Sequence, residues 1–404
     1  MIRWALLTVS LALLHAIFVC PISGQQDRFS QPGPYAAGWR SVTVTRPNAT
    51  TFTARLYYPA TQSGQNAPLD PAGRPYPAIT FGHGFLQAVS TYESTLNHLA
   101  SHGYLVIASN SESGLFPNHQ NFANDLRHSL TYLEQENANS GSFLFSSVAV
   151  EKFGASGHSM GGGASILATS QDARIKALAN LAAAETNPSG KAAMPLIAVP
   201  TSLISGSADT IVPVATNGQE MYAAGRPPKI LPIIQGGWHC GFQDASGFGC
   251  DSGSITRYQQ LGETRRLLTS FFDLYLKADA TAINSVWGDE LQNALTTAQR
   301  NSGISLSPEF QTVNAPVGEH VEISVTVTNH SAAPRSFKIE GAQRRWIIRV
   351  SPATTPAIAP GDSTTVTIST RRLWKNPALL NTIPLIVTPV GDPLTASFAK
   401  IELN

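Results

Sequence analysis

The stretch that decides the fold runs from Phe153 to Gly163 and reads Phe-Gly-Ala-Ser-Gly-His-Ser-Met-Gly-Gly-Gly. The apolar run Val148–Val150 precedes it, and the small, mostly apolar residues of Ala164–Ser170 follow it. This pattern predicts a buried strand, a tight turn and a helix. A Gly-x-Ser-x-Gly sequence in that context is typical of a nucleophile elbow, which lifts its serine clear of the sheet. We therefore predict Ser159 as a nucleophile.

The neighbours of this serine suit the same turn. Gly157 and Gly161 leave room where a side chain would collide across the turn. The backbone N–H of Met160 would lie at the helix N-terminus, where unpaired donors favour a negative charge. The pentapeptide alone also arises by chance in glycine-rich chains, so a base and an acid must be found elsewhere.

Strand-like and helix-like segments alternate over the first two thirds of the chain. We expect strands at 41–45, 52–58, 76–81, 104–108, 177–183, 201–204 and 230–234, and helices at 91–102, 121–136 and 264–277. This alternation predicts a parallel sheet with helices on both faces. In such sheets the site lies at the carboxyl ends of the strands.

Two polar residues follow expected strands at that edge. Asp209 comes after one strand and His239 after the next, in the order Ser, Asp, His that is typical of the α/β-hydrolase fold. Histidine can take the serine proton near neutral pH, and aspartate can fix its tautomer. Taken singly, Asp209 could be a surface turn residue and His239 a buried, hydrogen-bonded histidine.

The loop after the expected strand 76–81 reads His83-Gly84-Phe85. An α/β-hydrolase takes its second oxyanion donor from a loop in this place, so we assign that role to the Phe85 backbone N–H, together with Met160. His83 is interpreted as a residue that fixes the loop. His158 is expected to pack beneath the elbow and receives no chemical role.

Three segments resemble the bacterial cutinase and polyester hydrolase family of the dienelactone-hydrolase-like group: Gly157–Gly163, Ala208–Pro213 and Gly236–His239. The resemblance covers roughly residues 34–277. It implies the same roles for the nucleophile, acid, base and oxyanion donors, namely Ser159, Asp209, His239, Phe85 and Met160.

Two segments depart from that family: Ala182–Lys191, and the loop Cys240–Cys250 that follows the histidine. Its polyester hydrolases carry a tryptophan in the loop after the strand that follows the elbow, whereas Ala182–Lys191 has no aromatic residue and contains Glu185. The resemblance therefore implies ester hydrolysis but leaves activity on aromatic polyesters open.

Residues Met1–Gly24 are typical of an export signal, with Arg3 before an apolar run that is too short for a membrane span. An uncleaved anchor is the alternative. Cleavage would leave two cysteines, Cys240 and Cys250, which we expect to form a disulfide in an exported protein. Two isolated cysteines make a poor zinc site, and we expect no metal and no other cofactor.

The charges exclude some partners. The chain has 27 basic and 26 acidic residues, so nothing favours nucleic acid or anionic lipid. We expect a monomer without stable membrane insertion, secreted to act on an ester substrate, with polymeric and lipid esters among the candidates.

The pattern of apolar and polar residues changes after Lys277. We predict a catalytic domain over 25–280 and a linker over 281–303, with a short helix at 289–300. A β-sandwich of immunoglobulin-like type is predicted over 304–404, because short alternating runs such as 321–327 and 383–387 recur between turns. Attachment to a surface and passive stabilisation are both open roles for it.

These observations together predict an exported serine carboxylesterase of cutinase type. A lipase, an acetylhydrolase or a sugar-ester esterase would carry the same three residues. A binding protein that kept the hydrolase fold but lost catalysis is an alternative of another class, and reaction with a fluorophosphonate would distinguish it.

Overall fold

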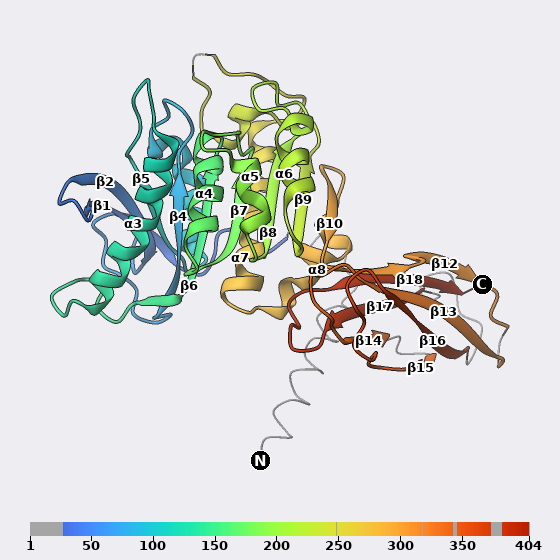
Figure 1. Ribbon diagram of the computed structural model, residues 1–404. Coiled ribbons are helices and arrows are strands. Elements are labelled where there is room, and N and C mark those ends of the chain that lie inside the picture. Colours follow the sequence, from blue (N-terminus) through green and yellow to red (C-terminus); the bar gives the residue numbers. More distant parts are fainter. Residues whose placement is uncertain (1–26, 248, 317, 342–345, 373–381, 404) are drawn as a thin grey trace. The chain divides into compact units, whose positions relative to one another are not determined.

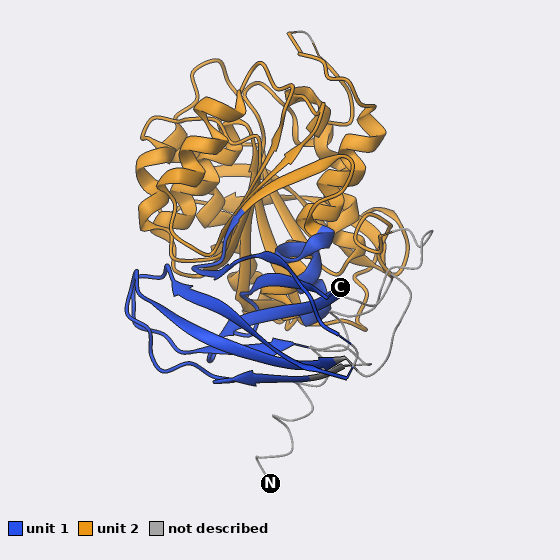
Figure 2. Cartoon of the chain, turned by 90° about the vertical axis from the view of Figure 1, so that its right-hand side faces the viewer, with its two compact units in different colours: residues 1–23, 279–290, 300–404 blue, residues 24–278, 291–299 orange. Residues whose placement is uncertain are grey.

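The computed structural model describes residues 27–403, apart from 248, 317, 342–345 and 373–381. The expected export signal, 1–24, lies outside the described residues. The described chain forms two compact units, shown in Figure 2. The larger comprises 27–278 and 291–299, and the smaller comprises 279–290 and 300–403.

The larger unit is built on a ten-stranded sheet with the order β10-β9-β8-β7-β6-β4-β5-β2-β1-β3 (Figure 1). Its strands are β1 (Ala36–Thr45), β2 (Thr51–Ala60), β3 (Gly64–Gln65), β4 (Tyr76–Gly82), β5 (Leu105–Ser109), β6 (Val148–His158), β7 (Ile175–Leu181), β8 (Thr201–Gly206), β9 (Lys229–Ile234) and β10 (Thr296–Asn301). Neighbours from β5 through β4 and β6 to β9 run parallel, and β1 and β2 form an antiparallel hairpin. The sheet is therefore mixed: its central strands are parallel as predicted, whereas β2 pairs antiparallel with β1 and with β5.

Helices cover both faces of this sheet. The α-helices of the unit are α2 (Glu93–Ser101), α3 (His119–Ala138), α4 (Met160–Gln171), α5 (Gly190–Ala193), α6 (Gly218–Ala224) and α7 (Arg257–Leu276). Its 3-10 turns are η1 (Val89–Tyr92), η2 (Met194–Leu196), η3 (Val214–Thr216) and η4 (His239–Phe242). α3 and α4 pack together on one face, and α7 lies on the other (Figure 1), where it packs against α2. The central strands β4 and β5 are buried on both faces, which explains their mostly apolar sequences.

The chain changes direction in the sheet between β4 and β6. From β4 it passes to β5 on one side, then returns to place β6 on the other side. Ligand sites of open α/β sheets form at the carboxyl ends of the strands at such a switch point. The loop after β4 and the elbow after β6 both lie at this position.

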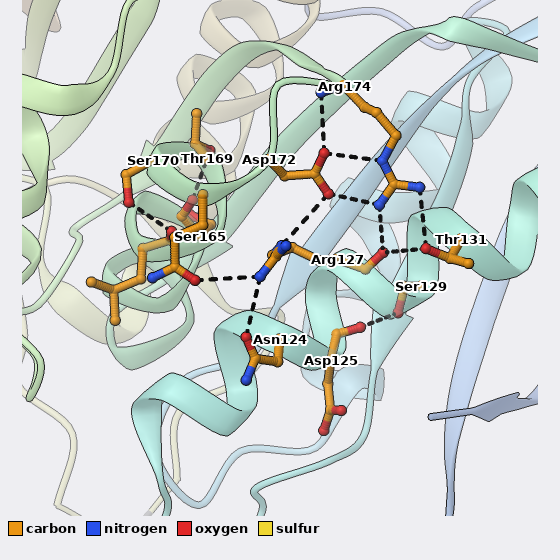
Figure 3. A network of polar contacts seen from close by, with 12 residues as sticks. Asn124, Asp125, Arg127, Ser129, Thr131, Ser165, Thr169, Ser170, Asp172 and Arg174 are labelled. Carbon is orange, nitrogen blue, oxygen red and sulfur yellow. Dashed lines mark hydrogen bonds and ion pairs between the residues drawn. The ribbon is translucent and has the colours of Figure 1, made fainter. Parts of the chain in front are cut away.

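A half-buried polar network holds the far end of α4 (Figure 3). Asp172, the residue after α4, accepts a hydrogen bond from Arg174 Nη2 at 2.7 Å, and Arg174 Nη1 also donates to Thr131 of α3 at 3.1 Å. Burial alone would raise the pKa of Asp172, but hydrogen bonds and charge from Arg174, with the charge of Arg127, outweigh it and lower the pKa. The helix that begins at the predicted nucleophile is thereby tied to α3.

The helix predicted over 289–300 is wrong. Asp289–Leu291 forms the 3-10 turn η6, and Thr296–Asn301 is strand β10, next to β9. The N–H of Gln235 donates to Leu295 O at 2.7 Å, and Thr296 Oγ1 donates to Glu263 at 2.7 Å. These contacts with distant residues outweigh the local helix propensity, because the open sheet edge supplies partners that a short helix lacks.

The smaller unit contains two four-stranded sheets, ordered β11-β13-β16-β15 and β12-β18-β17-β14. The strands are β11 (Ile304–Ser307), β12 (Phe310–Val313), β13 (His320–Asn329), β14 (Phe337–Gly341), β15 (Trp346–Ser351), β16 (Ser363–Arg372), β17 (Thr382–Pro389) and β18 (Ser397–Leu403), preceded by η5 (Ala280–Ala282) and α8 (Ile283–Trp287). Alternate residues such as Ile323, Val325 and Val327 share one buried core, as in a β-sandwich. Within the second sheet, β12 pairs with β18 in parallel. The immunoglobulin-like type of this sandwich stays a prediction.

Candidate active site

The predicted elbow lies between β6 and α4. Ser159 has φ 56° and ψ −121°, a left-handed conformation that a serine rarely adopts. Its N–H donates to Leu181 O at 3.0 Å, and its carbonyl oxygen accepts from Ala184 N–H at 2.9 Å. The end of β7 thus holds the strained residue from both sides, as expected where strain is retained at a functional position.

The two glycines of the motif are required by close backbone approach. A Cβ at Gly161 would lie 2.1 Å from the carbonyl carbon of Gly82, the last residue of β4. A Cβ at Gly157 would lie 2.4 Å from Gly161 O. The absence of side chains lets the first turn of α4 pack directly against the end of β4, where the loop with Phe85 begins.

The predicted acid and base contact each other. His239 Nδ1 lies 2.8 Å from Asp209 Oδ2, and both side chains are buried. The other oxygen, Asp209 Oδ1, accepts the N–H groups of Ile211 at 2.9 Å and Val212 at 2.6 Å. With the carboxylate so oriented, Nδ1 of His239 donates and Nε2 is left as the proton acceptor of the ring.

The elbow reaches this pair through His158. Its ring centroid lies 4.5 Å from that of His239, and the next residue in the chain is Ser159. The structure therefore brings the loop ends that carry the serine, the acid and the base to one place.

His158 has partners that sequence reasoning missed. Its Nδ1 lies 2.8 Å from the Tyr92 hydroxyl, which also accepts the N–H of Gly84 at 3.0 Å. Burial, with the charge of neighbouring His239, holds the pKa of His158 well below its usual value. Burial likewise raises the pKa of Tyr92. A neutral pair thus joins the elbow to the loop after β4, and nothing in the local sequence around Tyr92 signals it.

The two expected oxyanion residues follow β6 and β4. Met160 is the first residue of α4, where backbone N–H groups lack a helical partner. Phe85 follows β4, and its side chain is exposed. His83 fixes this loop, since its ring nitrogens lie 2.8 Å from Gly84 O and 2.9 Å from Ser111 O.

The loop after the base is closed by the expected disulfide between Cys240 and Cys250. Asp251, the next residue, accepts hydrogen bonds from the N–H groups of Thr210, His239 and Cys240 at 3.2, 2.9 and 3.1 Å. Asp244, in the same loop, instead accepts the N–H of Ser94 at 2.9 Å. The structure thus gives both carboxylates partners other than the imidazole of His239.

A cavity of about 660 Å³ lies at the opposite end of the sheet. Tyr76 at the start of β4, Lys152 near the start of β6 and Lys277 after α7 are among its lining residues. No predicted site residue lines it. Across the described residues, no cluster of three or more His, Cys, Asp or Glu side chains could hold a metal, and no helix is both long and apolar enough to cross a membrane.

Comparison with known proteins supports a family and a relative for this chain. A family model described as PET hydrolase-like matches residues 29–246, which include the elbow, the acid and the base. Cutinase est1 of Thermobifida alba is 29% identical over 147 residues, 36% of this chain and 47% of that protein. The match therefore spans about half the length of this curated relative.

Proposed function

Because the chain belongs to the PET hydrolase-like family, we propose that it is a serine carboxylesterase of cutinase type. The observation that carries the proposal is the Asp209–His239 pair beside the strained elbow of Ser159. A buried imidazole oriented by a carboxylate, next to a serine held at positive φ, is the arrangement that activates a hydroxyl nucleophile.

The chemistry proceeds through an acyl-enzyme. Ser159 Oγ attacks the ester carbonyl carbon while His239 Nε2 takes its proton, and Asp209 stabilises the resulting imidazolium. The N–H groups of Met160 and Phe85 bind the oxyanion. The C–O bond to the alcohol breaks, and His239 returns the proton to that alcohol. Water, deprotonated by His239, then releases the acid and restores Ser159.

The surroundings favour esters with an apolar acyl or alcohol part. Phe85 and Leu86 in the proposed oxyanion loop, Ile211 two residues after the acid, and Phe116 in the loop after β5 all expose apolar side chains. Exposed apolar side chains in loops that follow the sheet's carboxyl ends suit the binding of apolar partners. Polymeric and lipid esters are therefore the proposed substrates, and a lipase, acetylhydrolase or sugar-ester esterase activity is the alternative.

Activity on aromatic polyesters is a separate question. Glu185 is exposed in the segment where the family's polyester hydrolases carry a tryptophan, and its Oε2 accepts the N–H of Lys191 at 3.1 Å.

We propose that the enzyme is exported and acts as a monomer without a cofactor.

The experiment is a chain-length series of nitrophenyl esters at neutral pH, followed by an aliphatic and an aromatic polyester film. We expect hydrolysis of the soluble esters and of the aliphatic film. Absence of hydrolysis of every nitrophenyl ester would refute the proposed function. Cleavage of the aromatic film would show that the missing tryptophan is not needed.

A further inference from the structure

Asp251 stands at the junction of the two loops that hold the acid and the base. Thr210 directly follows Asp209 at the end of β8, and His239 begins the turn η4 after β9. One oxygen of Asp251, Oδ2, accepts the N–H of Thr210 at 3.2 Å and the N–H of His239 at 2.9 Å. The other, Oδ1, accepts the N–H of Cys240 at 3.1 Å.

We propose that Asp251 is a positioning residue for the Asp209–His239 pair, an inference that rests on the proposed function. A carboxylate that accepts backbone N–H groups makes charge-assisted hydrogen bonds, which are stronger than neutral ones. Here a single side chain bonds to backbone from both loops, and thereby fixes the backbone from which the acid and the base extend.

The disulfide explains why this carboxylate lies beside the base, but the disulfide does not itself hold the loop that carries the acid. The bridge joins Cys250 to Cys240, with a Cα–Cα distance of 5.7 Å, and so delivers the next residue to the start of η4. The bridge does not bond the loop with Thr210. The reach from the base loop to the acid loop comes from the Oδ2 atom of Asp251.

Removing the carboxylate should therefore lower kcat more than it changes the binding of substrate. A displacement of about 1 Å in a catalytic group can reduce turnover roughly 10²-fold. Asp251→Ala should lower kcat by about this factor. KM should change little, because the described hydrogen bonds of the Asp251 carboxylate go to backbone N–H groups that hold the catalytic loops. Asp251→Asn keeps an acceptor oxygen for Thr210 and His239, and should retain a kcat between those of Asp251→Ala and the unchanged protein.

The test measures kcat and KM on a soluble nitrophenyl ester at a temperature well below the melting temperature of every variant. Asp244→Ala is the matched control, because it removes a carboxylate of the same loop that accepts hydrogen bonds from the N–H and hydroxyl of Ser94 instead. We expect the control to lower the melting temperature and leave kcat within about two-fold. An unchanged kcat in Asp251→Ala, or an equal loss in Asp244→Ala, would overturn the positioning role.

A second readout does not depend on turnover. The Nδ1–H proton of His239, hydrogen-bonded to Asp209, should give a downfield NMR resonance, assigned by its loss in Asp209→Asn. In Asp251→Ala this resonance should shift or broaden, while in Asp244→Ala it should stay. An unchanged resonance in Asp251→Ala would overturn the inference, whereas an unreactive protein that still shows the shift would refute only the proposed function.

Discussion

Replacing Asp209 by asparagine tests the acid–base assignment with almost no change in shape. Asp209 Oδ1 accepts two backbone N–H groups, at 2.9 and 2.6 Å, while Oδ2 faces His239 Nδ1 at 2.8 Å. An asparagine must keep its only acceptor oxygen on the two backbone donors. Its NH₂ group then faces His239 Nδ1 and donates to it.

This reversal places the proton of His239 on Nε2. A ring protonated there cannot accept the proton of Ser159, so the base is lost although the fold is kept. We expect kcat to fall by about 10⁴-fold, equivalent to about 5 kcal/mol of transition-state stabilisation. The backbone bonds that remain should keep the melting temperature within a few degrees of the original.

The assay is steady-state hydrolysis of a nitrophenyl ester, with circular dichroism as a check of folding. Asp273→Asn is the control: it removes the charge of a buried aspartate of α7 that accepts from Tyr104 and pairs with Lys277. That variant should lose stability and keep turnover. A folded Asp209→Asn protein with near-normal kcat would refute the assignment of the acid.

The remaining predictions concern stability and the sandwich. Burial, with the nearby charge of His102, lowers the pKa of His98 to about 3; since an unfolded histidine titrates near pH 6.5, the free energy of unfolding should fall by up to about 4 kcal/mol as the pH drops from about 6.5 to 3. Urea unfolding over this range should show a flatter pH dependence in His98→Gln, and an unchanged one would contradict the role of His98. Cys250→Ser opens a loop of ten residues, which by the chain-entropy model is worth about 2–3 kcal/mol, and should lower both the calorimetric melting temperature and kcat; two free thiols in the exported protein would remove the basis of this prediction. If the sandwich provides attachment, deleting the chain from Ile304 onward should leave the hydrolysis of soluble esters unchanged and reduce the cleavage of films. A well-folded truncation that cleaves both substrates as fast as the full chain would exclude that role.

The central fold could be predicted because its signals are local. The sequence around Ser159 combines strand, turn and helix signals, and the need for glycine at 157 and 161 could be inferred from the same turn. The alternating apolar residues of β13, such as Val325, likewise revealed a buried strand face. Each of these features depends on residues that are neighbours in the chain.

Features that depend on distant partners could not be predicted. The strand β10 forms at the sheet edge through partners such as Glu263, about thirty residues earlier in the chain. Tyr92 meets His158 across 66 positions. The role of Asp251 depends on Thr210 and on the disulfide, and its only sequence signal is its place directly after Cys250.

The central claim is that Ser159 is an activated nucleophile, and active-site labelling tests it most directly. The protein would be treated with a fluorophosphonate, digested, and mapped by mass spectrometry while residual esterase activity is followed. We predict one adduct per chain, on Ser159, that accumulates in step with the loss of activity and is absent from Ser159→Ala. Esterase activity that persists without an adduct, or an adduct on another residue that tracks the loss of activity, would contradict the account.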